Sequence, residues 1–309
     1  MSGRLFIFLC FTALQNAITY PINNSGITPI DLSYECIDKT EECGNKAPVL
    51  LLHGLGGSKN NWNGIYETLA LRTGRRVCRA DLRNHGDSPW NNETSVAAMT
   101  EDVIHLLDTI EEQTSVIIGH SLGGKVAMHT ALNYPDRVSS LVIEDITPNT
   151  LDPEIVMIIE NYLYQMKIVM EAIPEGSDET QANKVISPHF KEFLKKFNIT
   201  ETDEAQNRLS PPLTCVGGTC RWRANLDVFL DAIENHFDSF WTPSSGTFIN
   251  SALFIYGTVS EFKVNEDEAN IRALFPNAEL IGVEGAGHII HGFYPQFENE
   301  VLNFLNKNN

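Results

Sequence analysis

The chain has 309 residues, of which 42% are hydrophobic, and a formal net charge of −18 at pH 7. This length allows one large α/β domain with an insertion, or two small domains. A strongly acidic surface repels nucleic acids and anionic lipid surfaces, so we expect no nucleic-acid partner. The apolar runs of the sequence are too short to span a bilayer, so we expect no stable membrane insertion either.

The first 19 residues have the features of an export signal. Arg4 is followed by an apolar run over residues 5–14, and Ala17 or Thr19 ends a plausible cleavage site. We therefore predict a signal peptide over residues 1–19 and a secreted protein, with a mitochondrial or other organellar location as the alternative. Export would also make three glycosylation sequons usable, at Asn23, Asn92 and Asn198.

The cysteines of the mature chain suit an oxidising compartment. Cys36 with Cys43, and Cys215 with Cys220, are close enough in sequence to form two local disulfides. Cys78 lies in a predicted strand, where we expect a buried free thiol. Neither pair has zinc-binding spacing, and we predict no metal and no organic cofactor.

Residues 20–147 alternate strand-length apolar runs with helical patterns, and we assign them to the first part of an α/β core. A strand covered on both faces is a continuous apolar run, as residues 49–52 are. This alternation predicts a mostly parallel sheet with helices on both faces. The expected strands lie near residues 32–36, just before 48, and at 49–52, 77–81, 116–118 and 141–143, and the helices at 60–71, 96–112 and 125–133.

The rhythm changes over residues 148–247, which carry helical patterns but no strand of the buried type. About a hundred residues are too many for a plain loop. We predict a helical cap, followed by the second part of the core over residues 248–309. The expected cap helices are 153–171, 179–197 and 225–237; the later core elements are strands at 252–256 and 279–283 and helices at 266–274 and 296–306.

Residues 116–124 read Val-Ile-Ile-Gly-His-Ser-Leu-Gly-Gly and lead directly into a helical pattern. A strand that turns at once into a helix leaves Ser121 on a sharp bend with its hydroxyl exposed at the strand's carboxyl end. Gly119 and Gly123 stand where a Cβ would collide with neighbouring backbone. This is the G-x-S-x-G nucleophile elbow in the context that the motif needs.

A serine hydroxyl needs a neighbouring base to take its proton. We assign that role to His288, which follows the glycines at 285 and 287 at the end of the last strand, and we keep His291 as a weaker candidate. Acyl chemistry also needs donors for the developing oxyanion. The backbone amides of Leu122, after the nucleophile, and of Leu55, in the glycine-rich turn after residues 49–52, are the candidates.

The carboxylate that orients the histidine has more than one candidate. The usual position, after the strand that follows the cap, holds Ser260 instead of an aspartate. Asp145 ends the preceding strand at the same edge of the sheet and is our first choice. Asp227, in the cap, is the alternative, and Glu261 is a third candidate.

Four motifs together resemble the α/β-hydrolase superfamily, and two others, together with the helix that contains Tyr162, resemble its "abhydrolase domain-containing protein 11" group. The resemblance implies the α/β-hydrolase fold and ester hydrolysis, with diacylglycerol-type lipids among the substrates. It carries Ser121 over as nucleophile and His288 as base, and relatives in the group leave both Asp145 and Asp227 open as the acid. The motifs are His53-Gly-Leu-Gly-Gly-Ser, Asp81-Leu-Arg-Asn-His-Gly-Asp-Ser, Gly119-His-Ser-Leu-Gly-Gly-Lys and Gly287-His288, then Glu144-Asp-Ile-Thr-Pro and Arg221-Trp-Arg-Ala-Asn-Leu.

The first cap helix is rich in apolar residues, which either hold the cap together or line a site for an acyl chain. We predict a hydrolase for small-molecule acyl esters that are lipid-like or otherwise apolar. A thioester, amide or lactone hydrolase, or a lipid-binding protein with a vestigial site, are the alternatives, and the oligomeric state stays open. The helix residues are Ile158, Ile159, Tyr162, Leu163, Met166, Ile168, Val169 and Met170.

Overall fold

The computed structural model describes residues 26–38, 46–196, 212–241, 245–291, 293 and 295–308. The predicted signal peptide and the sequons at Asn23 and Asn198 lie outside these residues, as does Cys43. Asn92 lies within them and is exposed. In the described part of the chain, the helices all fall short of the length and apolar character that a membrane crossing requires.

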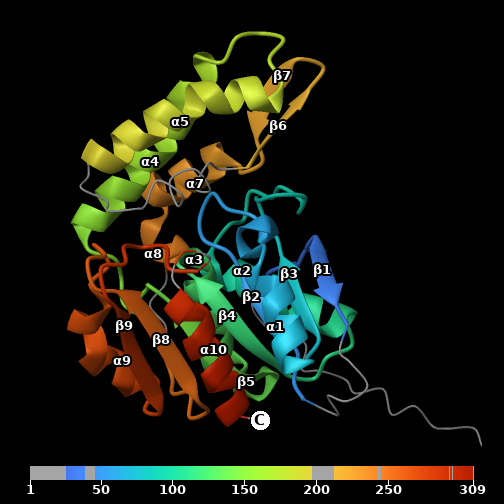
Figure 1. Ribbon diagram of the computed structural model, residues 1–309, viewed down its shortest axis with the longest axis vertical. Helices are drawn as coiled ribbons and strands as arrows, with labels where there is room; N and C mark the ends of the chain where they lie inside the picture. The colour runs from blue at the N-terminus through green and yellow to red at the C-terminus, as the bar shows by residue number, and fades with distance from the viewer. Residues whose placement is uncertain are drawn as a thin grey trace, which may run out of the picture.

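The core of the molecule is a seven-stranded sheet with the order β1-β3-β2-β4-β5-β8-β9 (Figure 1). Only β1, at one edge, runs antiparallel to its neighbour, so the predicted mostly parallel sheet is confirmed. The strands are β1 (Tyr34–Ile37), β2 (Val49–Leu52), β3 (Val77–Ala80), β4 (Ser115–His120), β5 (Val138–Glu144), β8 (Ala252–Gly257) and β9 (Ala278–Val283).

Helices cover both faces of the sheet (Figure 1). The residues of β2 show why its sequence is uniformly apolar: Leu50 and Leu52 pack into the cluster on one face, and Val49 and Leu51 into the cluster on the other. The first face carries α2 (Val96–Thr109), α3 (Leu122–Asn133) and α9 (Glu268–Leu274), and the second carries α1 (Ile65–Thr73) and α10 (Pro295–Lys307). Short 3₁₀ turns lie at Lys59–Trp62, Pro135–Arg137 and Val264–Asp267 in the described core.

The segment between β5 and β8 forms a separate layer over the edge of the sheet where the parallel strands end (Figure 1). Its amphipathic helices bury residues such as Leu163, Met166 and Phe229 against one another. The layer also holds a two-stranded hairpin that the apolar pattern did not predict, because most of the hairpin residues are partly or fully exposed. Its elements are α4 (Pro153–Glu171), α5 (Glu179–Lys196), β6 (Leu213–Val216), β7 (Thr219–Trp222), α7 (Leu226–Asn235) and α8 (Phe237–Phe240).

Two disulfides cross-link the described chain, and one of them corrects the sequence analysis. Cys215 and Cys220 are joined across the β6–β7 hairpin, as predicted. Cys36 is bonded to Cys78, so the expected Cys36–Cys43 pair and the free thiol at Cys78 are both wrong. The two residues are register partners of the antiparallel strands β1 and β3, with 4.1 Å between their Cα atoms. Proximity along the chain could not reveal this pairing across 42 residues.

Candidate active site

Ser121 occupies the tight turn between β4 and α3, with a φ of 52°. Such a conformation costs a non-glycine residue about 1–3 kcal/mol and is found mostly at functional sites. The flanking glycines let the turn close. A Cβ on Gly119 would lie 2.3 Å from the carbonyl oxygen of Gly123, and a Cβ on Gly123 would lie 2.3 Å from that of Leu52.

The loop after β9 brings His288 to the end of β5, where it meets Asp145. His288 Nδ1 donates to Asp145 Oδ2 at 2.7 Å. Asp145 is fully buried and also accepts hydrogen bonds from the Gly257 amide, at 2.9 Å, and from the Ser260 hydroxyl. Ser260, where the sequence lacks the usual aspartate, therefore binds the carboxylate that stands in for it.

The other acid candidates lie elsewhere. Asp227 lies on the first turn of α7, where its exposed side chain forms an ion pair with Lys167. Glu261 reaches the wall of the cavity that holds Ser121, but it makes no hydrogen bond to His288. Of the candidates, the structure brings Asp145 alone into contact with the histidine.

Burial sets the protonation state of this pair. Desolvation lowers the pKa of His288 to about 4, although the Glu144 carboxylate acts in the opposite direction. Its imidazole is therefore neutral near pH 7, with the proton on Nδ1 and a lone pair on Nε2. Burial raises the pKa of Asp145, while the hydrogen bonds from Ser260 and Gly257 act to lower it. The ring of Phe262 stacks on His288, with 3.9 Å between the centroids.

Ser121 and His288 line the same cavity. Among the described residues, no hydrogen bond joins the two side chains, which is common for catalytic pairs before a substrate binds. The sequence analysis expected them to come together from distant parts of the chain, and the structure places both in the lining of one cavity.

A second carboxylate–histidine pair lies next to the first, and the sequence analysis did not identify it. Glu144 is fully buried and accepts hydrogen bonds from the amides of Ile290 and His291 and from His291 Nδ1. Trp62 stacks on His291 with 4.3 Å between the ring centroids. His120 donates from Nε2 to the carbonyl oxygen of His288 at 3.0 Å. These contacts fix the loop that carries His288.

In the glycine-rich turn after β2, the amides of Gly56 and Gly57 are bound by residues that the structure describes. The Gly57 amide donates to the Gly54 carbonyl at 3.1 Å, and the Gly56 amide donates to His85 Nε2 at 3.0 Å. The amides of Leu55 and Leu122 donate to no residue that the structure describes. Leu55 borders the cavity beside Ser121, and Leu122 is the first residue of α3, so both predicted oxyanion donors lie beside the serine.

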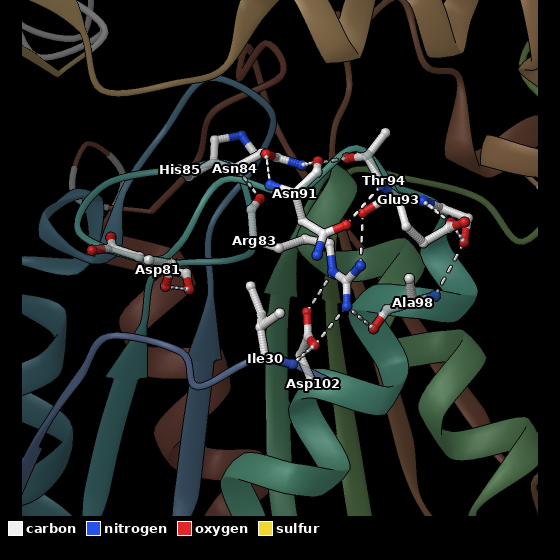
Figure 2. A network of polar contacts seen from close by, with 12 residues as sticks. Ile30, Asp81, Arg83, Asn84, His85, Asn91, Glu93, Thr94, Ala98 and Asp102 are labelled. Carbon is white, nitrogen blue, oxygen red and sulfur yellow. Dashed lines mark hydrogen bonds and ion pairs between the residues drawn. The ribbon is translucent and has the colours of Figure 1, made fainter. Parts of the chain in front are cut away.

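A polar network fixes the loop that supplies His85 (Figure 2). Arg83 forms a buried bidentate ion pair with Asp102, with N–O distances of 2.6 and 2.7 Å. The Asn84 side chain binds Asn91 through two hydrogen bonds of 2.8 Å, and the Asn84 carbonyl accepts from the amide of Asn225 in the cap. The loop is thereby tied both to α2 and to the cap, and it can hold the turn around Leu55 in place.

The cavity above Ser121 has a volume of about 160 Å³ and lies between core and cap. Its walls are almost entirely aliphatic and aromatic, and no lysine or arginine is among the described residues that line it. The helix α4 contributes Ile158, Ile159 and Tyr162 to the wall, whereas Leu163, Met166 and Val169 pack within the cap. The wall consists of Gly54, Leu55, His120, Ser121, Ile155, Ile158, Ile159, Tyr162, Phe190, Phe193, Trp241, Glu261, Phe262, His288 and Ile289.

In the described ranges, no cluster of side chains suits a metal ion. No three His, Cys, Asp or Glu side chains there are grouped as a metal site requires. The prediction that the protein needs no metal or cofactor stays a prediction.

The chain is similar to known proteins along most of its length. The family model described as "alpha/beta hydrolase fold" matches residues 47–295. The chain is 36% identical to "sn-1-specific diacylglycerol lipase ABHD11" of Mus musculus, over 91% of this chain and 87% of the relative. It is 31% identical to a "Probable alcohol acetyltransferase" of Saccharomyces cerevisiae, over 90% and 84% of the two chains. Among solved structures it is similar to "Marine microorganism esterase", with a TM-score of 0.71 and 27% identity over 89% and 99% of the chains.

Proposed function

Because the chain belongs to the α/β-hydrolase family, we propose that it hydrolyses carboxylic esters of lipid-like or other apolar acyl groups. The observation that carries this proposal is the shared cavity of Ser121 and His288, with Asp145 bound to the far side of the imidazole. The relatives named as lipases and esterases support the same reaction class.

In the proposed mechanism Ser121 Oγ attacks the ester carbonyl carbon while His288 Nε2 takes its proton. The carbonyl π electrons move onto the oxygen, which the amides of Leu55 and Leu122 stabilise. The intermediate collapses, the alcohol leaves with the proton from His288, and an acyl-enzyme remains. Water then attacks the acyl carbon while His288 Nε2 takes its proton. The bond between the acyl carbon and Ser121 Oγ breaks, Oγ takes the proton back from His288, and the free acid leaves. Asp145 holds the imidazole in the required tautomer and stabilises its cation.

The lining of the cavity favours a neutral substrate. The described wall carries no cation to bind a carboxylate or phosphate, and the Glu261 carboxyl would repel one when ionised. Apolar side chains from α4 and α5 can surround an acyl chain. We therefore propose neutral glycerides, the class named for the mouse relative, as substrates.

Acyl transfer to an alcohol is a second candidate, favoured by the yeast relative described as an acetyltransferase. An alcohol can take the place of water in the second step, because His288 can deprotonate either. Product analysis with and without added ethanol distinguishes the two: a new ethyl ester shows transfer, and free acid alone shows hydrolysis.

We also propose that the protein is exported. The apolar run after Arg4 and the two disulfides support this location. Expression in cultured cells tests it. We expect the chain in the medium, beginning after residue 19. Endoglycosidase treatment should lower its apparent mass on a gel. Retention inside mitochondria would contradict export.

The test of the enzymatic proposal is labelling of the purified protein by a fluorophosphonate, followed by a panel of neutral esters. We expect labelling that Ser121→Ala abolishes, together with turnover of acylglycerols. A folded wild-type protein that neither reacts with the probe nor cleaves any ester would favour a lipid-binding protein with a vestigial site. Labelling with cleavage of thioesters, amides or lactones only would assign a different reaction to the same site.

A further inference from the structure

Tyr162 brings a hydroxyl group into the cavity from the cap. Its ring lies beside the rings of Phe190 and Phe193, with 5.7 Å between centroids in each case. No residue that the structure describes forms a hydrogen bond with its hydroxyl, although the side chain lies within the apolar wall. A tyrosine hydroxyl in such surroundings usually has a partner, so an unpaired one at a binding site points to a ligand.

The hydroxyl lies beside the glycine-rich turn after β2. A Cβ built on Gly56 would lie 3.1 Å from Tyr162 Oη, so the absence of a side chain at Gly56 leaves room for the phenol. Gly56 also has a φ of 74°, which favours glycine. The hydroxyl thus borders the residue next to Leu55, whose amide has no acceptor in the described chain.

We propose that Tyr162 donates its O–H to the carbonyl oxygen of the substrate, as a third donor beside the Leu55 and Leu122 amides. This inference rests on the proposed ester hydrolysis. As Ser121 Oγ bonds to the carbonyl carbon, the π electron pair moves onto the oxygen, and the hydrogen bond from Tyr162 strengthens with the negative charge. Tyr162 keeps its proton throughout, and the bond relaxes when the alcohol leaves and the carbonyl re-forms. A donor that acts mainly on the transition state raises kcat more than it lowers KM.

The surroundings of Tyr162 suit a donor. Burial raises the pKa of the Tyr162 hydroxyl above its ordinary value, so the group stays protonated at any pH at which His288 acts as a base. The apolar neighbours also strengthen a hydrogen bond to a developing charge. Because Tyr162 lies on α4, the proposed set of three oxyanion donors is complete only when the cap lies over the glycine-rich turn after β2.

The variant Tyr162→Phe removes the hydroxyl and keeps the ring contacts with Phe190 and Phe193. The matched control is Tyr164→Phe, two residues along the same helix, where the hydroxyl binds Glu234 and the side chain is 42% exposed. Both variants are compared with the wild type on a diacylglycerol and on the ethyl ester of the same fatty acid. The rate at which a fluorophosphonate labels Ser121 is measured as well, because it needs no known substrate.

We expect Tyr162→Phe to lower kcat about tenfold to a hundredfold on both substrates, with KM nearly unchanged, and to slow labelling of Ser121. Its melting temperature should equal that of the wild type, because the hydroxyl binds nothing in the described chain. Tyr164→Phe should be as active as the wild type.

Wild-type turnover or labelling by Tyr162→Phe would overturn the proposal. So would a loss confined to the diacylglycerol, since that would mean that Tyr162 binds the free hydroxyl of the alcohol. A rise in KM alone, or a fall in activity matched by a fall in melting temperature, would also contradict it. A wild-type protein without turnover or labelling would instead refute the proposed hydrolysis itself.

Discussion

Two consecutive carboxylates at the end of β5 each hold a histidine, and the two pairs differ in what surrounds them. Glu144 binds His291 and two backbone amides beneath Trp62, and the His291 side chain is 5% exposed. Asp145 binds His288, whose side chain is 19% exposed and borders the cavity beside Ser121. A carboxylate and an imidazole thus form a buried pair in one place and a pair that borders the cavity in the other.

The difference teaches how to separate a reactive pair from a structural one. Both imidazoles are bound through Nδ1 to a buried carboxylate, so hydrogen bonding alone cannot distinguish them. Only His288 borders a space that a substrate can enter. We interpret the Glu144–His291 pair as structural, because it fixes residues 290 and 291 and so helps to position His288 in the same loop.

The largest expected effect comes from Asp145→Asn. The neutral amide cannot stabilise an imidazolium, and its NH2 group, placed against His288 Nδ1, would hold the imidazole in the wrong tautomer, so we expect kcat to fall by about 10³–10⁴ while the protein stays folded. Steady-state kinetics on an ester substrate, with a thermal melt of the variant, measure this. Activity within tenfold of the wild type would move the acid role to another residue.

A smaller loss is expected from Glu144→Gln, together with a shift in pH dependence. Although burial raises the pKa of Glu144, the nearby His291 and His120 outweigh it and hold that pKa at about 2, so the carboxylate is ionised at working pH. Its charge raises the pKa of His288, which is about 4 in the intact protein. Because His288 must be neutral to act as a base, wild-type kcat/KM should fall as the pH drops through about 4.

Loss of the Glu144 charge should move the fall of kcat/KM on the acid side to lower pH. The loop that carries His288 also loses a hydrogen-bond acceptor, and its displacement should lower kcat about tenfold. The amide also places a donor against backbone donors, which should cost about 1–3 kcal/mol of unfolding free energy. Initial rates across the acid range, with circular dichroism at each pH to verify folding, test all three effects. An acid limb that moves to higher pH would contradict the electrostatic role.

The smallest effect is expected from Asp227→Asn. The exposed Asp227 carboxylate on α7 pairs with Lys167, and surface pairs of this kind contribute about 0–1 kcal/mol. Activity should stay within twofold of the wild type under the same assay. A loss comparable to that of Asp145→Asn would mean that the cap rearranges when substrate binds.

Local sequence patterns predicted the parts of the site that short segments build by themselves. The turn around Ser121 follows from a strand, two glycines and a helix that are adjacent in the chain, while β2 and the end of β5 follow from the apolar runs at 49–52 and 141–143. His288 could be placed because the carboxyl ends of parallel strands share one edge. The choice between Asp145 and Asp227 could not be made, since it depends on the distance between segments that are far apart in sequence.

Most of the features that the sequence analysis missed depend on contacts between distant segments. The Glu144–His291 pair joins residues 147 positions apart in the sequence. The sequence of residues 144 and 145 alone does not show which of the two carboxylates binds the histidine beside the cavity. The hairpin β6–β7 lacks the apolar alternation of a half-buried strand, because it packs little against the core. The unpaired hydroxyl of Tyr162 is visible only once the neighbours of α4 are known.

The bond between Cys36 and Cys78 fastens the outermost strand of the sheet to β3 and closes a loop of about 42 residues. By chain-entropy reasoning such a closure contributes about 4 kcal/mol, a large share of the 5–15 kcal/mol that holds a typical domain together. A thiol-rich environment would withdraw that contribution and free the strand edge for pairing with other chains. The redox potential around the protein therefore governs its lifetime and its tendency to aggregate, independently of any effect on the reacting groups.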